Sequence, residues 1–320
     1  MSTISYLEAV VVGALQGISE LFPVSSLGHS VLLPALIGGH WATDLSVVGK
    51  DSPYLAVLVA MHVATALALV AFFWRDWVRI VAGLFSSIRD RQVATVDQRL
   101  AWLLVLGTVP VGIAGLLLDS ALRTVLGKPI PSAAFLAING LVLYTVERIR
   151  KSSPARPGEE LSDDTLDFST LEFSSAETMI MEPVTDTASD RRLARLTVKE
   201  AMLIGGAQSL ALLPGISRSG ITIVGGLLRG LRHDDAARFA FLLATPVILG
   251  AGVYKIPSLL EPANHDVLGP ALVGSLVAGI AAYLSVRFLT SYFETRTLTP
   301  FAVYCVIAGF GSLAYLMLTG

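Results

Sequence analysis

The sequence has too little charge for a soluble domain of its length. Only 15% of its 320 residues are charged, whereas ordinary soluble domains carry about 25%. Hydrophobic residues make up 53% of the chain, and the mean hydropathy is +0.68. This surplus of apolar side chains predicts a protein embedded in a lipid bilayer.

Other scarce features narrow the classes of function. The single cysteine, Cys305, excludes an internal disulfide. The first Lys or Arg is Lys50, so the N-terminus lacks the positive region of a secretory signal peptide. The sequence has no Cys/His spacing typical of a metal site and no nucleotide-binding glycine loop. It also has no basic patch interleaved with aromatic residues, so we expect no nucleic-acid partner.

Six apolar stretches are long enough to cross a bilayer, which takes about 20 residues. They cover residues 54–74, 100–118, 132–149, 239–256, 269–288 and 299–318. Two further apolar stretches, 6–38 and 199–228, are each broken in the middle by Pro and Ser, and the second also by Gly. Because proline removes a helix hydrogen bond, we expect both to form re-entrant helix hairpins, which enter and leave the membrane on one side.

The distribution of positive charge fits this topology. Lys and Arg concentrate in cytoplasmic loops of membrane proteins. If loops 75–99, 147–199, 229–238 and 287–296 are cytoplasmic, they hold 18 of the 23 Lys and Arg residues, against four in the outer loops. The remaining one, Arg218, lies inside the second hairpin. This excess of positive charge in the cytoplasmic loops arises only if neither broken stretch spans the membrane. The N-terminus then lies outside.

The two broken stretches also resemble each other. A shift of 192 residues aligns Gln16 with Gln208, Leu21 with Leu213, Ser25 with Ser217, Gly28 with Gly220 and Ser30 with Thr222. Each half has three spans and one hairpin, and an odd number of crossings inverts the second half. The predicted fold is therefore an all-α polytopic membrane protein with an inverted-topology repeat, six transmembrane helices and two re-entrant hairpins.

A linker is expected to join the first repeat, residues 1–150, to the second, residues 197–320. From Pro157 to Asp190 the chain has ten Asp or Glu residues and no Lys or Arg. This composition predicts an acidic, disordered cytoplasmic spacer over residues 151–196.

The break of the second hairpin has the residues of an anion site. Arg218 is costly at membrane depth unless it is paired, and its planar guanidinium matches phosphate oxygens. A helix is expected to begin there, and free N–H groups at a helix start bind anions. The side chains and close backbone expected around a bound phosphate belong to Ser217, Ser219, Gly220 and Thr222. The alternative is that Arg218 pairs with a buried carboxylate and the serines cap the helix.

The first hairpin adds acid, base and nucleophile candidates. Gln16 and Glu20 are four residues apart and share a helix face. Ser25, Ser26 and His29 follow the break. If the hairpins meet, Glu20, Ser26 and His29 face Arg218, which is the residue inventory of phosphoryl transfer. The alternatives are that Glu20 only pairs with Arg218 and that His29 only caps a helix.

Outside the hairpins, His62 lies within the span 54–74. A histidine in such a span is more often packed or pore-facing than catalytic, so His62 is not expected to act in the reaction.

These motifs resemble the undecaprenyl-diphosphatase family, also known as bacitracin-resistance proteins. The resemblance rests on Gln16-xxx-Glu20 followed by Phe-Pro-Val-Ser-Ser-x-Gly-His29, and on Pro214-Gly-x-Ser-Arg-Ser-Gly-x-Thr222. It extends to Phe73-Trp74-Arg75 and to the run from Phe239 to Pro246. It therefore covers both halves of the chain.

The resemblance implies hydrolysis of undecaprenyl diphosphate to undecaprenyl phosphate and inorganic phosphate, which recycles the lipid carrier of cell-wall synthesis. It also implies dependence on a divalent cation, Mg²⁺ or Ca²⁺, and a bacterial plasma membrane location with the site facing the periplasm or cell exterior. Catalytic roles would fall on Glu20, Ser26, His29 and Arg218, phosphate binding on Ser25, Ser217, Arg218, Ser219, Gly220 and Thr222, and metal binding on Glu20 and Gln16. Because position 16 is Gln and not Glu, the expected site has one carboxylate fewer. The nucleophile stays open between Ser26 activated by His29, His29 itself and a water molecule.

Three rival functions remain at this stage. Inverted repeats with re-entrant hairpins also build transporters, so flipping of a polyprenyl phosphate lipid is an alternative. A phosphatidic-acid-phosphatase type of enzyme would need a second His after Ser217-Arg218, where this chain has Ser-Gly-Ile-Thr-Ile. A scaffold protein would not retain buried Glu, His and Arg at paired breaks. Homodimer formation is left open by the sequence.

Overall fold

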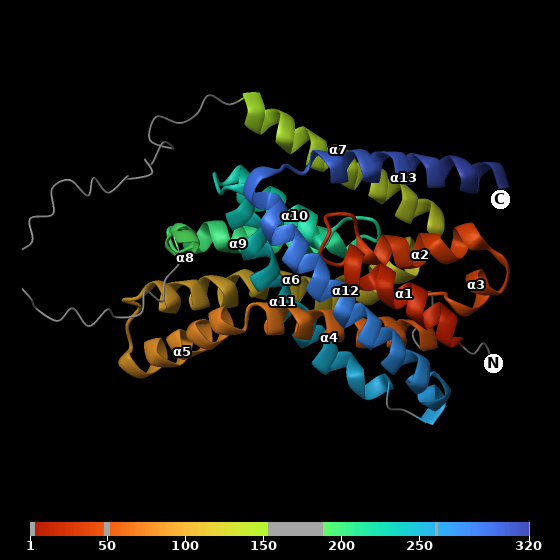
Figure 1. Ribbon diagram of the computed structural model, residues 1–320, viewed down its shortest axis with the longest axis horizontal. Coiled ribbons are helices and arrows are strands. Elements are labelled where there is room, and N and C mark those ends of the chain that lie inside the picture. Colours follow the sequence, from red (N-terminus) through yellow and green to blue (C-terminus); the bar gives the residue numbers. More distant parts are fainter. Residues whose placement is uncertain (1–3, 48–51, 153–187, 260–261, 320) are drawn as a thin grey trace, which may run out of the picture.

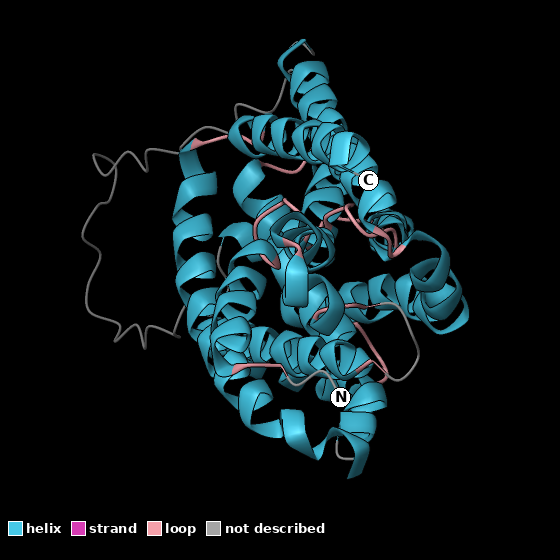
Figure 2. Ribbon diagram, turned by 90° about the vertical axis from the view of Figure 1, so that its right-hand side faces the viewer, coloured by secondary structure: helices cyan, strands magenta, loops and turns pink. Residues whose placement is uncertain are grey.

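A computed structural model describes residues 4–47, 52–152, 188–259 and 262–319. Every regular element in these ranges is a helix (Figure 2). Six helices are long and apolar enough to cross a membrane: Pro53–Phe72, Val96–Leu118, Pro129–Lys151, His233–Lys255, His265–Thr295 and Thr299–Thr319. The prediction of an all-α, six-span membrane protein is confirmed.

The elements follow one another along the chain as shown in Figure 1. The first half contains α1 (Tyr6–Ser19), α2 (Ser26–Ile37), α3 (Gly39–Asp44), α4 (Pro53–Phe72), α5 (Trp74–Asp90), α6 (Val96–Leu126) and α7 (Pro129–Ser152). The second half contains α8 (Ala188–Leu193), α9 (Val198–Ala207), the 3₁₀ helix η2 (Gln208–Leu212), α10 (Arg218–Leu228), α11 (His233–Leu259), the 3₁₀ helix η3 (Pro262–Val267), α12 (Leu268–Thr295) and α13 (Thr299–Thr319).

The two broken stretches form helix–break–helix units, as the prolines predict. In the first, α1 and α2 have 14 and 12 residues and are separated by a turn over residues 20–25. In the second, α9 and η2 lead into a turn before α10, which has 11 residues. At about 1.5 Å per residue, none of these helices reaches the roughly 30 Å thickness of a hydrocarbon core. Whether the units are re-entrant stays a prediction.

Helices from the two halves pack against each other. The most extensive pairs include α7 with α13, α1 with α12, α4 with α12, α4 with α11 and α6 with α9. Small residues allow these close approaches. A Cβ on Gly13 of α1 would collide with the backbone of Gly274 in α12, and a Cβ on Gly205 of α9 would collide with Gly107 in α6. Such contacts are typical of membrane helices, which gain stability from close packing.

The end of the expected linker differs from the prediction. Residues 153–187 lie outside the described residues, but 188–193 form helix α8. Asp190 in α8 is fully buried and makes ion pairs of 2.9 Å with Arg79 and 2.7 Å with Arg238. A carboxylate buried between two arginines holds α8 against α5 and α11. The linker expected over 151–196 therefore does not extend to residue 196.

Candidate active site

The breaks of the two hairpins lie against each other at the centre of the protein (Figure 1). The hydroxyl of Ser25 accepts hydrogen bonds from the backbone N–H groups of Gly28 and Gly215, each at 3.2 Å. A Cβ on Gly28 would come within 2.8 Å of the Cα of Gly215. Ser25 therefore begins α2 and joins the hairpins at the same time, and glycine is needed where the backbones touch.

Asn139, in the middle of α7, fastens both breaks. Its Nδ2 donates to the carbonyl of Pro23 at 3.1 Å, and its Oδ1 accepts from the N–H of Ser217 at 3.0 Å. Sequence reasoning missed Asn139. The available signal was a single amide in an otherwise apolar span, where an unpaired polar group is costly.

Glu20 is the centre of the polar cluster at this junction. Its side chain is only 3% exposed. One oxygen, Oε1, forms an ion pair with Arg218. The other, Oε2, accepts hydrogen bonds from Ser26 Oγ at 2.5 Å and from Gln16 Nε2 at 3.0 Å. The structure thus brings together four of the predicted site residues, Gln16, Glu20, Ser26 and Arg218.

His62 joins this cluster, although the sequence analysis treated it as a packed or pore-facing residue. Its Nε2 lies 3.2 Å from Glu20 Oε2, and its Nδ1 lies 2.7 Å from the carbonyl of Leu58. A carbonyl can only accept, so Nδ1 carries a proton. The remaining nitrogen, Nε2, faces the carboxylate oxygen that Ser26 and Gln16 also contact. His62 is therefore a further side chain at the Glu20 carboxylate.

The ring of His29 contacts α13 and not the Glu20 carboxylate. Its Nδ1 lies 2.7 Å from the carbonyl of Ser25, and its Nε2 lies 2.8 Å from the hydroxyl of Tyr304 in α13. The two rings are stacked with centroids 5.8 Å apart. Because Nδ1 donates to the carbonyl, neutral His29 accepts the hydroxyl proton of Tyr304 at Nε2. The expected pairing of His29 with Ser26 is absent from the described contacts.

The remaining predicted residues shape the start of α10. Ser217 caps this helix by accepting from the N–H of Gly220 at 3.1 Å. Ser219 Oγ donates to the carbonyl of Phe22 at 3.1 Å, and Thr222 Oγ1 donates to the carbonyl of Arg218 at 2.7 Å. These hydroxyls hold the helix start and tie it to the first break. The guanidinium of Arg218 is then the group directed at Glu20.

The residues present offer a partial site for a divalent cation. Among the described residues, no group of three or more His, Cys, Asp and Glu side chains could hold a metal ion. Gln16 Oε1, however, is buried without a hydrogen-bond partner beside the Glu20 carboxylate. Mg²⁺ is commonly held by one or two carboxylates together with substrate phosphate oxygens. Glu20 and Gln16 Oε1 fit that pattern if the substrate supplies the other oxygens.

Comparison with known proteins places this chain in a family. The family model for bacitracin resistance protein BacA matches residues 9–311, nearly the whole chain. The chain belongs to the BacA family. Among its BacA-family relatives, the undecaprenyl-diphosphatase of Mycolicibacterium paratuberculosis is 58% identical over 98% of both chains. The undecaprenyl-diphosphatase 1 of Frankia casuarinae is 51% identical over 97% of both. The undecaprenyl-diphosphatase of Granulibacter bethesdensis is 40% identical over 99% of this chain.

Proposed function

We infer that this chain hydrolyses undecaprenyl diphosphate to undecaprenyl phosphate and inorganic phosphate, and that this activity recycles the carrier of cell-wall synthesis and confers bacitracin resistance. The observation that carries the inference is the buried contact of Glu20 with both Arg218 and Ser26, at a junction built by two hairpins. Full-length similarity to curated undecaprenyl-diphosphatases supports the same reaction.

Arg218 is the phosphate-binding group in this proposal. In the absence of substrate its charge is balanced by Glu20. A terminal phosphate offers a higher negative charge and two oxygens for the guanidinium fork. When Arg218 turns to the phosphate, Glu20 loses its positive partner and its carboxylate becomes free to accept a proton. The same arginine stabilises the charge that develops as the anhydride bond breaks.

Ser26 is the nucleophile in this proposal. Its Oγ attacks the terminal phosphorus, its proton passes to Glu20 Oε2, and undecaprenyl phosphate leaves. Water then cleaves the phosphoserine and releases inorganic phosphate. Glu20 returns the proton to Ser26 Oγ as that oxygen leaves. Glu20 replaces His29 as the proposed base because Ser26 already donates to it. His29, hydrogen-bonded to Tyr304, is the alternative nucleophile.

A divalent cation, Mg²⁺ or Ca²⁺, belongs to the proposal as a cofactor that Glu20 and Gln16 Oε1 would hold. Glu20 has two oxygens, so Oε2, to which Ser26 donates, would still accept the proton. When bound, the cation would neutralise phosphate charge in the transition state. We also propose that the site faces the periplasm or cell exterior of the bacterial plasma membrane, because the Lys- and Arg-rich connections are assigned to the cytoplasm.

The test is phosphate release from undecaprenyl diphosphate by the purified protein in detergent, with Mg²⁺, Ca²⁺ or EDTA. Release should require the cation, and Arg218→Ala should lower it about a hundredfold to a thousandfold, the scale of one transition-state donor. Arg148→Ala, on the exposed side of α7, is the matched control. A folded, monodisperse protein without release would point to transport of the lipid instead, which a flipping assay in liposomes would then examine.

A further inference from the structure

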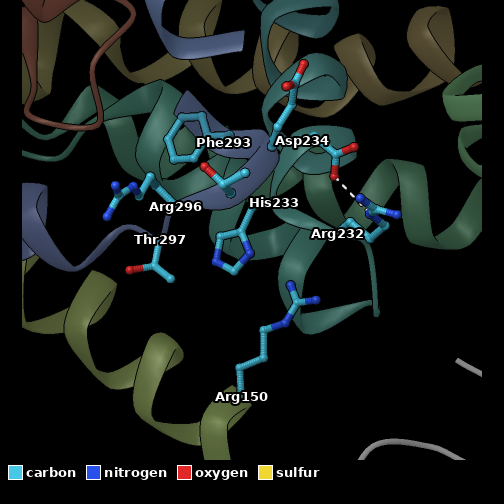
Figure 3. Close-up of a pocket in the computed structure, with 9 residues that line it drawn as sticks. Arg150, Arg232, His233, Asp234, Phe293, Arg296 and Thr297 are labelled. Carbon is cyan, nitrogen blue, oxygen red and sulfur yellow. Dashed lines mark hydrogen bonds and ion pairs between the residues drawn. The ribbon is translucent and has the colours of Figure 1, made fainter. Parts of the chain in front are cut away.

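A polar hollow lies beside the end of α10 that is opposite Arg218. Its volume is about 210 Å³, and its lining includes Arg150, Arg232, His233, Asp234, Glu294 and Arg296. Figure 3 labels the side chains of Arg150, Arg232, His233, Asp234 and Arg296 around it. They come from three connections far apart in the sequence: the end of α7, the turn between α10 and α11, and the turn between α12 and α13.

The hollow is separate from the reaction centre. On α7, Asn139 contacts the hairpin breaks and Arg150 reaches the hollow. The eleven residue steps from Asn139 to Arg150 correspond to about 16 Å along the helix. The length of α10, from Arg218 to Leu228, gives a similar separation. Changes at the hollow therefore leave the residues around Glu20 in place.

Two arginines of the hollow have charge that the described residues do not neutralise. Arg232 pairs with Asp234 at 3.2 Å. Arg150 donates to the carbonyl of Leu231 at 2.7 Å, a neutral acceptor. Within the described ranges, neither Arg150 nor Arg296 has a carboxylate at ion-pair distance. The lining contains three arginines, Asp234 and the exposed Glu294, so it carries one net positive charge when His233 is counted as neutral.

The walls of the hollow are fixed by hydrogen bonds that do not use these two arginines. His233 Nε2 lies 2.7 Å from Glu147 Oε1, and the same oxygen accepts from the N–H of Leu298 at 2.8 Å. The hydroxyl of Tyr292 donates to the carbonyl of Thr297 at 3.2 Å. These bonds hold the turn that carries Arg296. A preformed site loses less entropy when it binds a ligand.

We propose that this hollow binds a phosphate monoester group between Arg150 and Arg296. The net positive charge of the lining favours an anion, and phosphate oxygens match the donor geometry of the two guanidinium groups. The volume is several times the roughly 30 Å³ of one water molecule but below the roughly 300 Å³ at which sites for larger ligands begin. The hollow therefore suits a headgroup or free phosphate, and both sources share this chemistry.

The experiment measures binding of two probes, phosphatidic acid and inorganic phosphate, to the full chain. The protein is placed in phosphatidylcholine nanodiscs with increasing phosphatidic acid, and retained lipid is counted by native mass spectrometry. Inorganic phosphate binding is measured separately by calorimetry. Arg150→Gln combined with Arg296→Gln should weaken binding by about tenfold per arginine, the scale of one charge-assisted hydrogen bond. Arg148→Gln, on the same helix outside the hollow, should bind like the wild type.

The outcomes separate the two sources. Arginine-dependent binding of phosphatidic acid alone identifies a lipid headgroup site, and arginine-dependent binding of inorganic phosphate alone identifies a free-phosphate site. Equal binding of both probes by the wild type and the double variant would overturn the proposal. Arg296→Gln alone is the second variant, since Arg296 is exposed and its loss should not unfold the protein. Phosphate release from undecaprenyl diphosphate should be unchanged in all of these variants, which checks their folding.

Discussion

At the scale of single residues, the cluster depends on how four side chains share the carboxylate of Glu20. His62 is the member of this set to which the proposal gives no part in binding phosphate, in nucleophilic attack or in holding the cation. We predict that His62→Leu lowers kcat about tenfold to a hundredfold, the scale of lost supporting hydrogen bonds at a reactive group, and leaves KM nearly unchanged.

Steady-state phosphate release tests this prediction. His40→Leu is the control, since its side chain is 72% exposed and lies 3.7 Å from Glu8, away from the cluster. A His62→Leu enzyme with wild-type turnover would return His62 to a packing role.

Ser26 allows the sharpest test of the nucleophile. Ser26→Ala removes the attacking oxygen and the hydrogen bond to Glu20 together. We expect turnover to fall about a thousandfold or more, as for other enzymes that lose their nucleophile. Ser30→Ala, one helical turn further on, is a matched control because the buried hydroxyl of Ser30 has no hydrogen-bond partner in the part of the chain that the structure describes. Near-normal turnover of Ser26→Ala would assign the attack to His29 or to water.

The sequence predicted only part of this cluster, because a sequence pattern shows which residues are unusual but not which residues meet in the fold. Glu20 and Arg218 stand out because charges in apolar stretches are rare. His62 and Asn139 were not predicted as site residues, because periodicity does not tell which face of a long span meets another segment. His29 was expected beside Ser26, but its ring contacts Tyr304, which is 275 residues away in the sequence. Long-range partners of this kind are set by the fold.

At the scale of helices, the two hairpins begin alike. Ser5 and Glu8 form a capping box at α1, and Thr197 and Glu200 form one at α9. Both pairs are related by the shift of 192 residues that aligns the breaks. Each of these helices also packs against the other half of the chain: α1 packs on α12 of the second half, and α9 packs on α6 of the first. These parallels support the predicted inverted repeat.

The junction of the hairpins should be sensitive to Asn139. Asn139→Leu removes the acceptor of the Ser217 N–H and leaves the Pro23 carbonyl, among the described residues, with only the weak thiol donor of Cys305 at 3.7 Å. Each unsatisfied group costs about 1–3 kcal/mol, so we predict a lower unfolding temperature in detergent together with loss of phosphate release. Thr145→Val is the control on the same helix, because within the described ranges the Thr145 hydroxyl donates to the carbonyl of Leu141 and makes no other hydrogen bond. An Asn139→Leu protein as stable as the control would show that the breaks hold without this amide.

At the scale of the whole molecule, the ionic contacts of α8 explain why the predicted linker extended too far toward residue 196. Composition averages over a segment, whereas a single buried carboxylate decides whether a short helix docks. Asp190 meets Arg79 of α5 and Arg238 of α11, and Arg192 pairs with Asp235 of α11 at 2.5 Å. These partners lie 111, 48 and 43 residues away, so the docking could not be read from local composition.

The arrangement of the whole chain in the membrane gives the last prediction. Because α9 and α10 are each too short to cross, the second hairpin should start and end on one side. Cysteines placed at Lys199 and at Arg229, both exposed, should therefore react with a membrane-impermeant maleimide only from the cytoplasmic side. Replacement of Cys305, which is fully buried, with Ser provides the background.

Two reference positions fix the sides in the same labelling experiment. Val93, which follows α5, should react from the cytoplasm, and Thr319, at the end of α13, from outside. Labelling of Lys199→Cys and Arg229→Cys from opposite sides would mean that the second broken segment crosses the membrane. The second half would then have four crossings against three in the first, so the two halves could not form an inverted repeat. Labelling of both from the cytoplasm keeps the two halves opposed, so that Arg218 approaches Glu20 from the opposite membrane face.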